Sequence, residues 1–336
     1  MDPIASSLLT AVAARYGIAP SELTQLSGGH FAWVFGFRRP GQDCILRITP
    51  PNEDASLNST RQILEWLAFL ADHGGPVSCP IRSLVGSLIE ILDYADQTYL
   101  STAFEKAPGI LAEEMLPEDW NDVLFQSLGR AVGSCHRIAS QYLPLVDSRR
   151  PPWDQPTNCY NPLDALHGAD AILLAKRRSV LEALASLPRD AENYGLAHMD
   201  LHFANFFVDA ASSKITFFDF DDCAYGWYLM DLAMLLFDAL VVYGGADREK
   251  FARHFLEHLL RGYLPQKSLD RFWIAQLPLF LKLLEIGLYI ILYRDYDPAE
   301  SDGWASKFMP GRRERIEQDI PYVDLDFAQI LEAACS

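Results

Sequence analysis

The sequence predicts an α+β protein with two unequal lobes, a small β-rich lobe over residues 1–105 and a larger, mainly helical lobe over residues 106–336. Three observations support this class. Short runs of aromatic and β-branched residues occur before residue 105, and helical periodicity dominates after it. The stretch EKAPGIL separates these two regions. A chain of 336 residues, half of them hydrophobic, is long enough to bury one large core or two modest ones.

The small lobe is expected to begin with a helix that stops at Gly17 and to continue with a hairpin. Its strands are Phe31–Arg39 and Asp43–Pro51, joined by a PGQ turn. A helix should follow, with Ser59 as its N-cap and Gly74 as its stop. Two or three more strands are expected in CPIRSLVGSLIEIL and QTYLSTAF, which completes a small α+β lobe.

The large lobe should be helical except for one β-like patch. That patch consists of NYGLAHMDLHFANFFVD and SSKITFFDFDDC, separated by a tight turn at residues 210–213. The expected helices are Trp120–Gln141, Asp170–Leu187, Tyr228–Val242, Arg248–Tyr263, Leu269–Tyr293 and Asp326–Ala334.

Charge and cysteine content narrow the classes of function. The net charge of −17 argues against nucleic acid as a partner, because phosphates need basic patches. It suits a cationic small substrate, although solubility alone also explains it. The six cysteines are scattered and form no CxxC pair, which suits reduced thiols in the cytoplasm and argues against a zinc site. The N-terminus shows no basic signal-peptide region. No oligomeric state is indicated.

The most apolar run, Leu277–Tyr293, is interrupted by Lys282 and Glu285 at helical pairing distance. This pattern predicts a buried core helix rather than a membrane span, so no membrane partner is expected.

Three polar residues in the β-like patch match the needs of phosphoryl transfer from ATP. That reaction requires a carboxylate that orients the attacking hydroxyl and accepts its proton, and oxygen ligands for a divalent metal. Asp200, Asn205 and Asp219 occur in this order as His-x-Asp-x-x-x-x-Asn followed by an Asp after apolar residues. Each residue alone could be a turn former or a cap. Their order and spacing together favour a catalytic site.

The text HMDLHFANFFVD … ITFFDFDDCAYGWYLMDLA resembles the aminoglycoside phosphotransferase and homoserine/choline kinase group, whose usual text is HGDLHPGN…IDF…G…DLA. The resemblance implies a protein-kinase-like fold, with ATP and Mg²⁺ as cofactors. It implies that Asp200 is the catalytic base and that Asn205 and Asp219 bind the metal. His202 would lie near the transferring phosphate, and Asp231 would be the structural aspartate of the following helix.

This chain departs from the family text inside the loop. Met199 replaces the glycine before the catalytic aspartate, and Phe203 and Ala204 replace Pro-Gly. These changes make the loop more apolar but remove no reactive group. His198 is expected to be a packed, hydrogen-bonded residue.

The small lobe offers candidate groups for the nucleotide. Gly28 and Gly29 lie between strand-like runs, where backbone N–H groups can approach phosphates without a Cβ in the way. A Gly-Gly pair also occurs in ordinary hairpin turns. It is their position before two strands and a helix, similar to the family's glycine loop, that favours a phosphate-binding role.

A cation on the next strand and the start of the linker complete the nucleotide site. Arg47 stands where kinases have lysine, and Glu65 on the following helix is its expected partner. Each alone could be a surface residue, but the catalytic loop downstream favours a functional pair. Ala103 and Phe104 begin the stretch whose backbone would meet adenine.

The acceptor is the least specified part of the prediction. The resemblance implies a small-molecule hydroxyl, and acidic residues at Asp221, Asp222 and Glu285 would suit an acceptor with an amino group. The stretch Arg294–Arg313 is expected to be a loop that closes over it. Two alternatives stay open: a bacterial stress-type protein serine/threonine kinase, and a nucleotide-binding pseudoenzyme.

Overall fold

The structure is a computed structural model, and it describes residues 3–26, 32–51, 56–144, 149–155, 171–293, 296–297 and 303–336. The chain divides into two compact units. The N-terminal unit contains Met1–Pro108, Tyr142–Arg150 and Thr216–Asp221, and the C-terminal unit contains the remainder.

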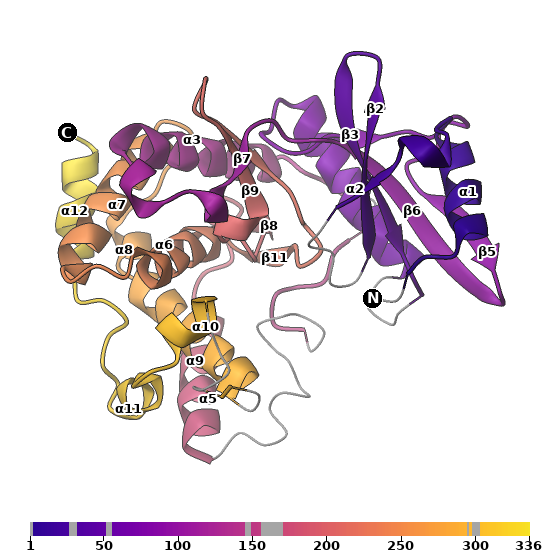
Figure 1. Ribbon diagram of the computed structural model, residues 1–336. Coiled ribbons are helices and arrows are strands. Elements are labelled where there is room, and N and C mark those ends of the chain that lie inside the picture. The colour runs from indigo at the N-terminus through magenta and orange to yellow at the C-terminus, as the bar shows by residue number, and fades with distance from the viewer. Residues whose placement is uncertain are drawn as a thin grey trace. The chain divides into compact units, whose positions relative to one another are not determined.

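The N-terminal unit is built on an antiparallel sheet with the order β1-β2-β3-β6-β4, and β5 pairs with β6 (Figure 1). The central hairpin forms because the turn at Gly41, with φ of 78°, suits a residue without a side chain. The strands are β1 (Thr24–Gln25), β2 (Trp33–Arg39), β3 (Gln42–Thr49), β4 (Pro80–Ile81), β5 (Glu90–Tyr94) and β6 (Gln97–Glu105).

Two helices accompany this sheet. The helix α1 (Ser6–Arg15) buries Leu8 and Val12 in a core with Phe35 and Leu46 of the sheet. The helix α2 (Leu57–Asp72) begins three residues earlier than predicted. Its N-cap is Ser56, whose Oγ accepts the N–H of Ser59 at 3.1 Å, so the predicted cap at Ser59 is wrong.

A segment from the middle of the chain belongs to the N-terminal unit. Phe217 exchanges backbone hydrogen bonds with residues 76–78 at 2.8 and 3.0 Å. Phe220 packs edge-on against Trp66, with ring centroids 5.2 Å apart. This segment therefore carries Asp219 and Asp221 into the N-terminal unit.

The C-terminal unit is mainly helical, as predicted, with short strand pairs set among the helices (Figure 1). Its helices are α3 (Asp122–Ala139), α5 (Ala171–Ala185), α6 (Leu229–Tyr243), α7 (Arg248–Tyr263), α8 (Arg271–Ile274), α9 (Leu277–Tyr293), α10 (Gly303–Phe308), α11 (Arg312–Glu317) and α12 (Phe327–Ala334). The strand β8 (Tyr194–Ala197) pairs with β11 (Ala224–Trp227). The strands β10 (Lys214–Phe217), β9 (Phe206–Asp209) and β7 (Ile110–Leu111) form a second sheet.

The helices α3 and α7 lie side by side and run in the same direction (Figure 1). Their backbones approach closely at two glycines. A Cβ on Gly129 would lie 1.8 Å from Leu259 O, and one on Gly262 would lie 1.9 Å from Gln126 O. Any side chain at these positions would force the helices apart.

Two predictions for the end of the chain differ from the structure. The single helix expected over Leu269–Tyr293 is divided into α8 and α9, because Pro278 lacks an N–H to continue the bonding pattern. The stretch expected to be a loop before Arg313 contains α10 and the start of α11 in its described part.

The stretch Arg271–Tyr293 is long and apolar enough to cross a membrane by length and composition, but 61% of its most apolar window is buried inside the protein. Glu285 in α9 is completely buried. The prediction of a core helix agrees with this burial.

Candidate active site

The loop after β8 holds Asp200 between two buried hydrophobic residues. Met199 and Leu201 are each 1% exposed, whereas the Asp200 side chain is 29% exposed. The backbone of Met199 has φ of 70°, a left-handed value that residues with a side chain rarely adopt. The text that this loop resembles has glycine at this position, so Met199 adopts the turn at a cost in backbone strain.

The buried carboxylate of Asp231 in α6 holds this turn. It accepts the N–H of Met199 at 2.8 Å and that of His198 at 3.1 Å. It also pairs with His136 Nε2 at 2.9 Å. Burial acts to raise the pKa of Asp231, but the bond and charge of His136 outweigh it, so the pKa is lowered and the group stays ionised.

A second aspartate holds the other end of the loop. Asp238 lies two turns after Asp231 on α6, and its Oδ2 accepts the N–H of Phe203 at 2.8 Å. Its Oδ1 accepts the indole N–H of Trp304 in α10 at 2.6 Å. The loop from His198 to Phe203 is therefore fixed to one helix at both ends.

The loop brings three of the predicted residues together. Asp200 Oδ2 lies 3.3 Å from His202 Nε2 and accepts a 3.3 Å hydrogen bond from Asn205 Nδ2. Asn205 Nδ2 also donates to the backbone oxygen of Asp200 at 2.8 Å. Burial acts to raise the pKa of Asp200, but its contacts with His202, and then His198 and Asn205, lower it overall. Asp200 is an ionised carboxylate at neutral pH.

The fourth predicted residue, Asp219, lies in the N-terminal unit close to an ionic cluster. Arg47 binds the Asp221 carboxylate through both terminal nitrogens. Arg150 donates to Asp221 O at 2.8 Å and to Ser59 Oγ at 2.6 Å. Burial acts to lower the pKa of Arg47, but Asp221 and then Asp219 raise it.

The structure describes four of the six residues that were predicted to contact the nucleotide. Arg47 pairs with Asp221, and it forms no ion pair with Glu65, although both are among the described residues. Ala103 and Phe104 lie in β6 between β3 and β4. Gly28 and Gly29 lie outside the described residues.

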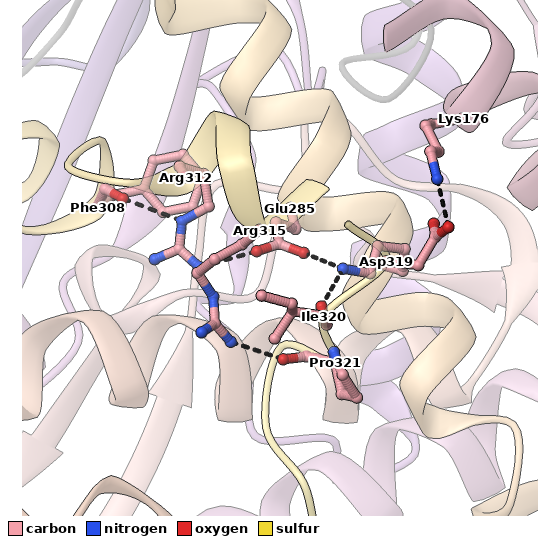
Figure 2. A network of polar contacts seen from close by, with 9 residues as sticks. Lys176, Glu285, Phe308, Arg312, Arg315, Asp319, Ile320 and Pro321 are labelled. Atoms are coloured by element: carbon pink, nitrogen blue, oxygen red, sulfur yellow. Dashed lines mark hydrogen bonds and ion pairs between the residues drawn. The ribbon is translucent and has the colours of Figure 1, made fainter. Parts of the chain in front are cut away.

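The structure does not support Glu285 as a contact for an acceptor. Glu285 is completely buried, and Figure 2 shows its carboxylate in a network of polar contacts within the C-terminal unit. It accepts from Lys282 Nζ at 2.5 Å and from Arg312 at 2.8 Å. Lys282 also donates to Ile320 O at 2.6 Å. The Lys282–Glu285 pair therefore connects α9 to Arg312 and Ile320 in the C-terminal part of the chain.

Comparison with known proteins decides the family. A model of the phosphotransferase enzyme family matches residues 22–271. The chain belongs to this family. It is therefore an enzyme that transfers phosphoryl groups, and the predicted resemblance and kinase-like α+β fold are confirmed.

Individual members of the family show how far the similarity extends. Amicoumacin kinase of Bacillus subtilis (strain 168) is 32% identical over 332 residues, which is 96% of this chain and 95% of that protein. A solved amicoumacin kinase in complex with AMP-PNP, Ca²⁺ and Ami has a TM-score of 0.83 with 29% identity, and the match covers 96% of each chain.

More distant structures support the fold alone. A microcompartment-associated aminopropanol kinase has a TM-score of 0.67 at 20% identity, covering 98% of this chain and 95% of the other. A spectinomycin phosphotransferase in complex with ADP and spectinomycin has a TM-score of 0.60 at 15% identity, covering 99% of each chain.

Sequence reasoning missed two of the residues that hold the loop. His136 was counted only as part of a helix, and Asp238 was not singled out. The available signal was the charge itself, because LMDLAMLLFDALVVY is apolar except for two aspartates seven residues apart, on one helical face. Such a pair on a buried helix needs polar partners.

Proposed function

We propose that this enzyme transfers the γ-phosphate of ATP to a hydroxyl group of a small molecule that also carries an amino group. Family membership supports the reaction class. Amicoumacin kinase, at 32% identity across nearly the whole chain, supports a small-molecule acceptor, and the net charge of −17 suits an acceptor with an amino group. The observation that carries the proposal is the ionised Asp200, held with Asn205 on a loop whose two ends are bonded to α6.

In this proposal Asp200 orients the acceptor hydroxyl and takes its proton. The lowered pKa keeps the carboxylate in the basic form, and the fixed loop holds it in one place without reorganisation. We propose that His202, whose Nε2 lies 3.3 Å from Asp200 Oδ2, contacts the transferring phosphate. The proton accepted by Asp200 passes to solvent after transfer.

The chemistry of the two proposed ligands suits a divalent metal. Asn205 directs its Nδ2 to Asp200, so Oδ1 is the amide atom left for a cation. Asp219 has a carboxylate. Hard oxygen ligands of this kind suit Mg²⁺. When bound, the metal would neutralise the phosphate oxygens of ATP. We propose these two residues as its ligands because their order and spacing follow the family pattern.

The nucleotide contacts stay proposals of the same kind. The N-terminal unit would bind ATP through Arg47 and the backbone of Gly28 and Gly29, with Ala103 and Phe104 near adenine. The C-terminal unit would bind the acceptor. A cytoplasmic location fits, because the described cysteines are free thiols and ATP is available there.

The test is an ATP-consumption assay with amicoumacin, 1-aminopropan-2-ol, spectinomycin, amino-free alcohols and a generic protein substrate. We expect turnover with an amino alcohol. Asp200→Asn should lower kcat by about 10²–10⁴-fold while ATP still binds. Asp96→Asn, a change in an exposed turn of the N-terminal unit, is the matched control. Phosphorylation of the protein substrate alone would replace the proposal with the protein-kinase alternative.

A further inference from the structure

We infer that the C-terminal unit carries a second metal site, of the zinc type, formed by Asp122, His254 and His258. It is independent of the proposed ATP site. Among the residues that the structure describes, the nitrogen and oxygen donors of these three side chains converge, all within 4.8 Å of one another. Two imidazoles and one carboxylate are a ligand set typical of zinc with an open fourth position.

The geometry follows from the helices. His254 and His258 are one turn apart on α7 and present their rings on one face, with centroids 4.6 Å apart. The spacing His-x-x-Glu-His places two zinc ligands in this way on known metal-binding helices. Its Glu257 pairs with Arg261 at 2.7 Å, so we assign Glu257 no role at the metal.

Asp122 reaches this face from the first turn of α3. Its Oδ1 lies 2.8 Å from His254 Nε2, and its Oδ2 lies 3.5 Å from His258 Nε2. Donors in a tetrahedral site with bonds of about 2.0–2.1 Å lie about 3.3 Å apart, so small side-chain movements suffice. The close crossing at Gly129 and Gly262 fixes α3 and α7 at this separation.

A supporting residue is already in place behind one ligand. Gln126 Nε2 lies 3.0 Å from His258 Nδ1. Rotating this amide by 180° would let its oxygen accept Nδ1–H, which leaves the Nε2 lone pair of His258 for a metal.

The cluster opens onto a cavity of about 510 Å³. Asp122 and His254 form part of its wall, and the rest is largely aromatic, from Trp120, Phe125 and Phe251. The open coordination position would therefore face a space that can hold an additional small ligand.

The simplest alternative is that Asp122 serves only as a hydrogen-bonding partner of the two histidines. Titration of the full-length protein with Zn²⁺ separates the two. The protein is first stripped with chelator and then saturated with Mg²⁺ and AMP-PNP, which fills the proposed ATP site. We expect one Zn²⁺ per chain in calorimetry, with affinity lowered more than about tenfold in His254→Ala and in Asp122→Asn.

The matched control is His73→Ala, an exposed histidine at the end of α2, which should bind like wild type. Asp122 and His254 have side chains about half exposed (52% and 51%), so these variants should fold. Zn²⁺ should raise the melting temperature of wild type and His73→Ala, and not that of His254→Ala. Absence of saturable binding, or binding unchanged in both site variants, would overturn the inference.

Discussion

The loop around Asp200 and the segment around Asp221 are fixed by different kinds of contact. The loop is tied to Asp231 and Asp238, both at most 5% exposed, through backbone N–H groups. Asp221 is tied to Arg47 by an ion pair whose side chains are 45% and 25% exposed. Buried bonds to backbone are costly to lose, whereas partly exposed ion pairs exchange readily with solvent and salt.

This difference suits two roles. A catalytic carboxylate works best when its position is fixed before the substrate arrives. A cation that must bind phosphate works best when its resting partner can be displaced. Substitutions at Asp231, Met199 and Asp221 test whether the loop is held more firmly than the Asp221 ion pair.

Asp231→Ala should have the largest effect. It leaves His136 and the N–H groups of His198 and Met199 without their shared acceptor in a buried position. We expect a loss of about 3–5 kcal/mol in the free energy of unfolding, measured by urea denaturation. The comparison is Asp221→Ala, which should cost less than about 1 kcal/mol. Equal losses in the two variants would remove the contrast.

Met199 tests the strained backbone of the loop. Its side chain is buried and packs closely on Gly226, so Met199→Ala should cost about 2–5 kcal/mol. Met199→Gly removes slightly more of the side chain but accepts φ of 70° without strain. We therefore expect the glycine variant to be more stable than the alanine variant by about 1 kcal/mol. A less stable glycine variant would show that the turn is not strained.

The charge of Asp231 should make part of the stability depend on pH. Folding keeps the pKa of Asp231 below its ordinary value of 3.8, so the unfolded chain binds the proton first as the pH falls. The stabilisation by the ionised Asp231 is complete when the pH is above the ordinary pKa. It is lost as the pH falls through the lower pKa of the folded protein. Asp231→Asn should cost about 1–3 kcal/mol at neutral pH.

The difference in the free energy of unfolding between wild type and Asp231→Asn should therefore become smaller below pH 3.8, the ordinary pKa of this carboxyl group. Urea denaturation of both proteins at a series of pH values measures it. A gap that stays constant in acid would assign the effect of Asp231 to its shape rather than its charge.

The sequence predicts Asp200 and Asn205 as reactive residues of the loop, because their spacing is a local pattern. It does not reveal the residues that position the loop. Asp238 and His136 act on the loop from helices far away in the sequence, and only the tertiary fold brings them together. The pairing of Arg47 was missed for the same reason, since its partner Asp221 lies 174 residues away. Glu285 was predicted to contact the acceptor for the same reason, since its partner Arg312 is brought to it only by the tertiary fold.

Asp221→Asn should have the smallest effect on stability and an informative effect on ATP. The unfolding free energy should change by less than about 1 kcal/mol, because the ion pair is partly exposed. If Arg47 binds phosphate as proposed, Asp221 competes with ATP for the guanidinium, so removing its charge should lower the KM for ATP. Salt weakens the same ion pair, so the KM of wild type should depend on ionic strength differently from that of the variant. A raised KM for ATP in Asp221→Asn, or a loss above about 2 kcal/mol in its free energy of unfolding, would contradict this prediction. Asp221 would then hold its segment as firmly as Asp231 holds the loop, and the two regions would not differ.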